Sequence, residues 1–74
     1  MNLRELRESN YWTLSRLANR ADMSIGKLSQ LERGIGPVGL STVPKLARAF
    51  RRSRPFIQAV VDETFATANV EEVA

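Results

Sequence analysis

The chain has 74 residues, of which 43% are hydrophobic and 26% charged, and its formal net charge is +3. This composition is typical of one small globular domain with a thin core, which leaves no room for a separate catalytic domain. The sequence contains no cysteine and no histidine, which excludes disulfides, thiol nucleophiles, nearly every zinc site and the usual general base at neutral pH, so we expect no metal and no cofactor.

The first two helices are predicted from apolar spacing and from their end signals. Leu3 and Leu6 lie among charged residues in a first helix that ends at Ser9 and Asn10. Thr13 is a suitable N-cap for a second helix from residue 14 to about residue 21. The apolar positions of this helix follow the spacing of one helical face: Leu14, Leu17, Ala18 and Ala21.

A third helix is predicted after a tight turn at Asp22 and Met23. Ser24 is its expected N-cap, and it runs to about Arg33. Gly34 then suits the left-handed position that often follows a helix. The apolar face of this helix consists of Ile25, Leu28 and Leu31.

Two further helices are predicted beyond a loop that contains several glycines. Ser41 is the expected N-cap of a fourth helix, which tolerates Pro44 in its first turn. Pro55 is expected at the first position of a fifth helix that runs to about residue 69. The buried stripe of the fourth helix consists of Val43, Leu46, Ala47 and Phe50.

These elements predict an all-α fold, a compact bundle of five short helices, because no segment has the period-two alternation of a strand. We expect one domain over residues 1–69 and a frayed acidic tail over residues 70–74. No apolar stretch approaches the roughly 20 residues of a membrane span, and the first residues lack a signal-peptide pattern, so we expect a cytoplasmic protein without a membrane partner.

The second and third helices form the functional pattern. Two short helices joined by a turn of a few residues are the unit of a helix-turn-helix. An α-helix fits the major groove of DNA, where short and hydrogen-bonding side chains reach base edges. Opposite its apolar stripe, the third helix carries such residues: Ser24, Gly26, Lys27, Ser29, Gln30 and Arg33.

Four segments resemble the phage-repressor and Cro type of helix-turn-helix, the XRE family. They are residues 13–18, 23–24, 28–34 and 46–50. The resemblance implies a lambda-repressor-like DNA-binding domain with its helix-turn-helix in helices two and three and its recognition helix over residues 24–33. The base contacts that it implies are Ser24, Ile25, Gly26, Lys27 and Gln30.

The chemistry of three of these residues fits base recognition. Lys27 suits guanine and Gln30 suits adenine, whereas Ile25 either touches a thymine methyl group or packs in the core. The resemblance also implies an ion pair between Arg7 and Glu32. This pair is either partly buried and structural or a solvated surface pair.

The sequence departs from the family where phosphates are usually bound. Leu14 stands in place of a glutamine, Asp22 in place of a glycine in the turn, and the loop over residues 35–40 is uncharged. We expect the phosphate contacts to come from Thr13, Arg16, Ser29, Arg33 and Lys45, with Arg48 as a further candidate.

Three groups of residues leave alternatives open. Arg51, Arg52 and Arg54 either complement the dipole at the end of the fourth helix or contact DNA. Tyr11 and Trp12 either wedge the first helix against the second or stack on bases. The apolar residues of the fifth helix either form a dimer interface or only cover helices one and four: Phe56, Ile57, Val60, Val61 and Phe65.

The distribution of charge favours a polyanionic partner. All 11 basic residues and four acidic ones fall in residues 1–54, a formal charge of +7, whereas residues 55–74 hold four acidic residues and no basic one. The sequence therefore predicts a sequence-specific regulator, a repressor that binds a palindromic site in double-stranded DNA as a homodimer. The alternatives are an antitoxin or another protein-interaction module on the same scaffold, and a structural protein without DNA binding.

An enzyme is not expected. The acidic pairs at residues 62–63 and 71–72 are adjacent in sequence, and adjacent helical residues do not face each other. The glycines at positions 34, 36 and 39 lack the Lys-Ser/Thr that follows a phosphate-binding loop.

Overall fold

The computed structural model describes the backbone of residues 1–73 and the side chains of residues 1–68. Within these residues the fold contains helices and no strand, which confirms the predicted all-α bundle. The five helices are α1 (Leu3–Ser9), α2 (Leu14–Arg20), α3 (Ile25–Glu32), α4 (Thr42–Phe50) and α5 (Arg54–Val73).

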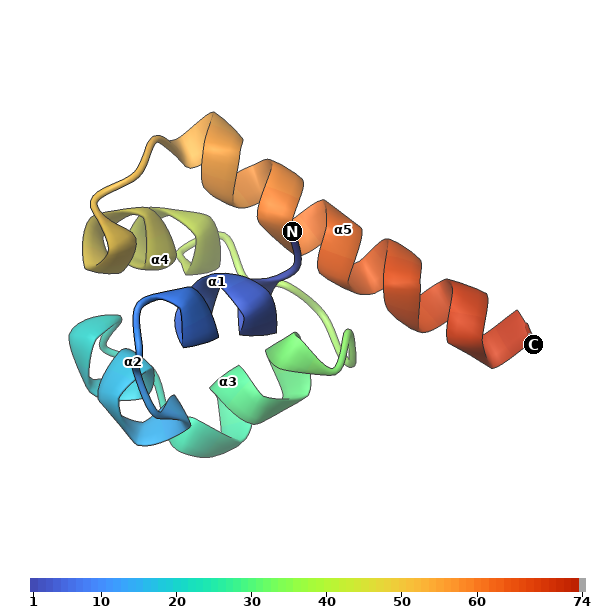
Figure 1. Ribbon diagram of the computed structural model, residues 1–74, viewed down its shortest axis with the longest axis horizontal. Coiled ribbons are helices and arrows are strands. Elements are labelled where there is room, and N and C mark those ends of the chain that lie inside the picture. The colour runs from blue at the N-terminus through green and yellow to red at the C-terminus, as the bar shows by residue number, and fades with distance from the viewer. Residues whose placement is uncertain (74) are drawn as a thin grey trace.

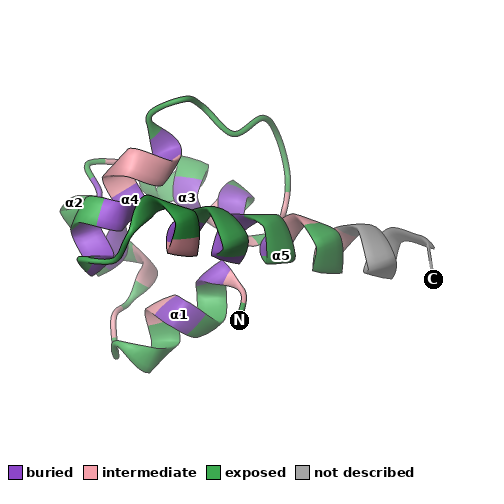
Figure 2. Cartoon of the chain, turned by 90° about the horizontal axis from the view of Figure 1, so that it is seen from above, coloured by how far each residue is buried: buried purple, intermediate pink, exposed green. Residues whose placement is uncertain are grey.

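Helices α1 to α4 form the body of the molecule, and α5 packs across α4 and α1 (Figure 1). The first part of α5 lies against the body, whereas its C-terminal part extends beyond it (Figures 1 and 2). The fold thus has one small core and one projecting helix.

Helix α5 is longer than the sequence predicts. It has 20 residues and continues to Val73, whereas the predicted end was near residue 69. No glycine or proline follows Pro55, so nothing in the chain interrupts the helical backbone. The domain limit at residue 69 and the fraying of residues 70–74 stay predictions, because residue 74 and the side chains beyond residue 68 lie outside the described residues.

Each helix contributes one side chain without exposed surface to a single core. Partly buried side chains pack around these residues, among them Val43 and Phe56. Figure 2 shows the buried residues on the inner faces of the helices. Burial of a side chain of this size contributes about 1.5–3 kcal/mol, so each of these residues adds substantially to the stability of the fold. The fully buried residues are Leu3, Leu17, Leu28, Leu46 and Ile57.

The first three helices begin at side-chain caps, as their sequences predict for α2 and α3. The Asn2 side chain accepts from the Glu5 backbone N–H at 2.8 Å while Glu5 accepts from the Asn2 N–H, which makes a capping box on α1. Thr13 accepts from Arg16 N–H, and Ser24 accepts from Lys27 N–H, each at 3.1 Å. Each cap satisfies a backbone donor that has no partner inside its own helix.

The starts of α4 and α5 differ from the prediction. Ser41 occupies the N-cap position of α4 but makes no side-chain cap, because its backbone is already in the helical region rather than extended. Helix α5 begins at Arg54, so Pro55 is its second residue. The missing N–H of Pro55 costs no bond there, since the first helical N–H groups have no intrahelical partner.

Gly34 lies where α3 passes α5 at close range. Its φ is +68°, and a Cβ atom added to it would lie 2.6 Å from the Cβ of Ala68 and 3.3 Å from the Thr64 carbonyl oxygen. A side chain would therefore meet both a strained backbone and a clash. The sequence predicted the backbone requirement, and the contact with α5 comes from the fold.

The core predicts that two leucines contribute very differently to the free energy of unfolding. Replacement of the fully buried Leu46 by alanine should lower the free energy of unfolding by about 2–5 kcal/mol, because it removes apolar contacts and leaves a cavity. The same replacement at Leu40, which is fully exposed, should change it by no more than about 0.5 kcal/mol. Urea denaturation measures both, and equal losses at the two positions would contradict the assigned core.

Candidate nucleic-acid interface

A fixed turn holds α2 and α3 against each other. Asp22 adopts a left-handed backbone with φ +54°, as its place in the turn predicts. Met23 N–H donates to the Ala18 carbonyl at 2.9 Å, and Lys45 Nζ donates to the Asp22 carbonyl at 3.1 Å. Leu17 and Leu28, one from each helix, are both fully buried in the core. The turn thus sets the direction in which α3 leaves α2.

The five residues predicted to contact bases share the exposed surface at the start of α3. Leu28 and Leu31 point into the core, so the other side of the helix is open. Ile25 is 50% exposed, which makes its side chain accessible at the surface rather than enclosed in the core. Nothing lies within 4 Å of the position of a Cβ atom on Gly26. The exposed residues are Ser24, Ile25, Gly26, Lys27 and Gln30.

The residues predicted to contact phosphates differ in their exposure and in the hydrogen bonds that they already make within the chain. Thr13 and Arg16 are exposed at the start of α2. Arg33 is exposed as well, but its Nε donates to the Ser29 carbonyl at 3.4 Å, and Ser29 itself is half-buried. Lys45 is half-buried and uses one of its three donors on the Asp22 carbonyl. Two N–H groups of Lys45 therefore remain for another acceptor.

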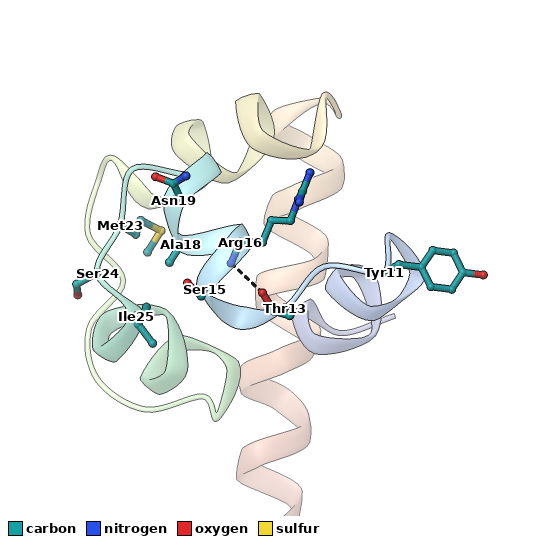
Figure 3. A pocket seen from close by; sticks show the side chains of 9 residues that line it. All are labelled: Tyr11, Thr13, Ser15, Arg16, Ala18, Asn19, Met23, Ser24 and Ile25. Carbon is teal, nitrogen blue, oxygen red and sulfur yellow. Dashed lines mark hydrogen bonds between the residues drawn. The ribbon is translucent and has the colours of Figure 1, made fainter.

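A polar groove runs between α2 and the start of α3 (Figure 3). Thr13 and Arg16 lie in its middle, with Ser24 and Ile25 at one side and Tyr11 at the other. The sequence did not single out Ser15 and Asn19 for this groove, because exposed polar residues on a short helix are too common to be a signal. The lining residues are Tyr11, Thr13, Ser15, Arg16, Ala18, Asn19, Met23, Ser24 and Ile25.

A second hollow brings two lysines together from different helices. Lys27 of α3 and Lys45 of α4 line it with Ser24, Ser41 and Thr42. Asp22 also lines this hollow and is its single acidic residue. Two ammonium groups and three hydroxyl groups in one hollow make a surface that favours an anionic partner.

An ion pair fixes the first helix to the end of α3. Arg7 donates from Nε and Nη2 to the two Glu32 carboxylate oxygens at 2.6 and 3.2 Å, while its Nη1 donates to the Trp12 carbonyl at 2.9 Å. The two side chains are only 13% and 8% exposed, so the pair is partly buried. The hydrogen bond with Glu32 raises the pKa of Arg7 above its usual value, against the effect of burial. The Arg7 guanidinium group therefore stays protonated at every pH of interest.

The two aromatic residues before α2 have different environments. The Trp12 ring stacks on Phe50 with a centroid distance of 5.2 Å, and the Arg20 guanidinium lies 4.5 Å from the Trp12 ring centroid. Trp12 thus joins the α1–α2 turn to α4. Tyr11 is 95% exposed. The predicted wedge between the first two helices is therefore wrong for Tyr11, whose side chain points away from the body (Figure 3) and whose backbone is left-handed with φ +58°.

The apolar residues of α5 divide between the core and the surface. Ile57, Val60 and Val61 are buried in the core of this chain, which corrects their predicted place in a dimer interface. These three cover the helices beneath them, since α5 packs on α4 and α1. Phe56 and Phe65 are half-buried, so part of each ring remains accessible.

The arginines near the end of α4 are exposed. Arg51 has a left-handed backbone and follows the last residue of α4, and its N–H donates to the Arg48 carbonyl at 3.3 Å. The Arg52 guanidinium lies 3.8 Å from the centroid of the Phe56 ring. Arg51 and Arg52 thus sit at the carboxyl end of α4, where a positive charge is favourable, and both alternatives for Arg51, Arg52 and Arg54 stay open.

The described part of the chain offers neither a metal-binding cluster nor a membrane-spanning helix. No group of three or more acidic side chains there is arranged to hold a metal ion. No helix there is both long enough and apolar enough to cross a membrane.

The comparison with known families decides the class of the protein. A family model described as a helix-turn-helix domain matches residues 1–59. The chain belongs to the helix-turn-helix domain family. This match covers α1 to α4 and the start of α5, and the family indicates a DNA-binding regulator. No curated protein and no solved structure matches the chain.

The ion pair gives the second prediction. Replacement of Glu32 by alanine should lower the free energy of unfolding by about 3 kcal/mol, because Arg7 is left partly buried without its partner. Replacement of Arg7 by lysine keeps the charge but not the two-pronged geometry, and it should cost less than the loss of Glu32. Glu8 is exposed and pairs with Arg4 at 3.4 Å, so Glu8→Ala is the matched control and should cost at most about 1 kcal/mol. A loss at Glu32 as small as that at Glu8 would show a solvated pair.

Proposed function

We propose that the chain is a sequence-specific regulator, a repressor that reads the major groove of double-stranded DNA with α3. The observation that carries this proposal is the exposed surface of α3, where Lys27 and Gln30 are open to solvent while Leu28 and Leu31 are buried. The helix is thus anchored on one side and open on the other, as a helix that enters a groove must be. The repressor role rests on the resemblance of the sequence to phage repressors, and the proposed cytoplasmic location accords with a domain family that indicates DNA binding.

Base recognition follows from the donors and acceptors on that surface. Lys27 donates to O6 or N7 of guanine, and Gln30 pairs with N6 and N7 of adenine. The exposed Ile25 offers an apolar contact to a thymine methyl group, and the bare backbone at Gly26 allows close approach to the base pairs. Each good two-pronged contact contributes about 1–3 kcal/mol of discrimination.

Phosphate contacts would come from the groove and the lysine hollow beside α3. Thr13 and Arg16 line the groove between α2 and α3, and Lys27 and Lys45 line the hollow between α3 and α4. Both sites border the start of α3, so their hydroxyl and cationic groups can bind phosphates close to the bases that α3 reads. These contacts set orientation and salt dependence rather than sequence preference.

We also propose that the protein binds as a homodimer on a palindromic site. A single module of this size contacts few base pairs, and a two-fold pair places two recognition helices about 34 Å apart on one face of DNA. Of the predicted dimer interface, Phe56 and Phe65 are still partly accessible and could contact a second copy of the chain. Sedimentation of the free protein and of its DNA complex tests this point separately. The proposal includes no catalytic activity.

The recognition helix is tested by selection and substitution. Selection from random duplexes should yield a palindrome bound roughly 10³-fold or more tighter than random DNA. Lys27→Ala and Gln30→Ala should each weaken binding by about 1–3 kcal/mol for each half-site and relax the preference at one base pair of each half-site. Fluorescence anisotropy measures the affinities.

Gln58→Ala is the matched control. Gln58 is exposed on α5, where it donates to Asp62 at 2.9 Å, so its loss should leave DNA binding unchanged. If Gln30→Ala binds the selected site as tightly as Gln58→Ala does, α3 is not the reading helix. If the protein binds DNA weakly, without sequence preference, and loses this binding near physiological salt, the basic surface attracts DNA only by nonspecific electrostatics.

One observation favours a second candidate, an antitoxin or other protein-interaction module. The exposed side of α5 carries the acidic residues Asp62 and Glu63, of which Glu63 pairs with the N-terminal ammonium group of Met1. These carboxylates are accessible to a basic partner protein. Purification of the chain from its native source with a stoichiometric partner would favour this function.

A further inference from the structure

Tyr11 has no role in folding that the described part of the chain accounts for. Its side chain is 95% exposed, and its ring is not among the hydrophobic side chains that pack against the core. Its hydroxyl group makes no hydrogen bond within the described residues, although its backbone N–H donates to the Glu8 carbonyl at 2.9 Å. An exposed aromatic ring contributes no burial energy, so the fold gains nothing from tyrosine here.

The backbone at this position disfavours tyrosine. Tyr11 has φ +58°, a left-handed conformation that glycine, asparagine and aspartate adopt more readily than an aromatic residue. The turn after α2 has Asp22 in the corresponding conformation, and the turn after α3 has Gly34. A phenol side chain therefore occupies a site where folding alone favours a different residue.

The turn that carries Tyr11 is held on both sides. Trp12 N–H donates to the Arg7 carbonyl at 3.3 Å, and Arg7 Nη1 donates to the Trp12 carbonyl at 2.9 Å. Trp12 is stacked on Phe50 of α4, and Arg7 is paired with Glu32 of α3. The phenol group is thus presented from a fixed backbone, which reduces the entropy lost when it binds.

Tyr11 also lies at the end of the polar groove beside α3. Figure 3 shows its side chain pointing outward beyond Thr13 and Arg16, on the opposite side of the groove from Ser24 and Ile25. The groove offers hydroxyl, amide and guanidinium donors from Thr13, Ser15, Arg16 and Asn19. A DNA strand that follows these donors away from the bases read by α3 passes Tyr11 next.

We infer that the Tyr11 hydroxyl donates a hydrogen bond to a backbone phosphate of the duplex that flanks the bases read by α3. This inference rests on the proposed function and extends its footprint outward. A phenol donates well to an anionic oxygen, and such a charge-assisted bond is short and strong. Because the phenol is neutral, the contact releases no condensed counterion and carries no sequence information.

The test compares Tyr11→Phe with wild type on the selected duplex with long flanks, over a series of salt concentrations. For each DNA-bound protomer, Tyr11→Phe should weaken binding about tenfold, by the same factor on every sequence, and leave the salt dependence unchanged. Arg16→Ala should instead lower the slope of log affinity against log salt by about 1 for each bound protomer, because it removes a charged contact. Tyr11→Asn should bind as Tyr11→Phe does and unfold no more easily than wild type, since asparagine suits the left-handed backbone.

Neutral phosphates locate the contact. Methylphosphonate, which lacks the negative charge, is introduced at one flanking position at a time. At one position, the substitution should weaken wild type but not weaken Tyr11→Phe any further, because the two changes remove the same hydrogen bond. At the other positions, the effects should add.

Three outcomes would overturn the inference. Equal affinities of Tyr11→Phe and wild type would show that the hydroxyl does not contribute, and if Tyr11→Asn alone were weaker, the ring would be acting by stacking or packing. Additive effects at every methylphosphonate position would show that no single phosphate is the acceptor. Failure of wild type to prefer any duplex overturns the proposed function as well, and it is seen before any Tyr11 variant is made.

Discussion

The contact of Arg7 with Glu32 and with the Trp12 carbonyl connects three segments that are distant in sequence. It joins α1, the turn before α2 and the end of α3 through one guanidinium group. The isolated helices α1 and α2 have only seven residues each, too few to be stable in water on their own. Their orientation therefore depends on tertiary contacts, and this ion pair supplies a directional one at the edge of a core that is otherwise held by non-directional apolar packing.

Most of the fold could be predicted from local patterns. Thr13 and Ser24 each precede an apolar repeat, and Asp22 and Gly34 stand where a left-handed backbone ends a helix. The errors fall where a residue's conformation depends on its neighbours in space. Ser41 is a residue type that often caps helices, but it lacks the extended backbone that a side-chain cap requires. Helix α5 has no breaker in its sequence, so its end could not be located from composition alone.

The candidate site was predictable only in part, and for a physical reason. The period of apolar residues in α3 shows which side is buried, and so which residues are exposed, including Lys27 and Gln30. In α5, the spacing of apolar residues cannot distinguish a side chain that is buried by its own chain from one that is buried by a partner. This explains why Ile57 and Val60 were assigned to a dimer interface although they lie in the core of this chain. Nor can sequence show that Lys27 and Lys45 line one hollow, because their proximity depends on the packing of α4.

The stacking of Trp12 on Phe50 has an optical consequence. Trp12 is the single tryptophan in the sequence, and its half-buried indole lies against both an aromatic ring and the Arg20 guanidinium. The emission of the protein therefore reports one place, the junction of the α1–α2 turn with α4. A ligand that fills the neighbouring groove and shifts the turn would change this emission while the indole stays against Phe50. Unfolding would instead separate the two rings, so one native fluorophore distinguishes local movement of the turn from unfolding.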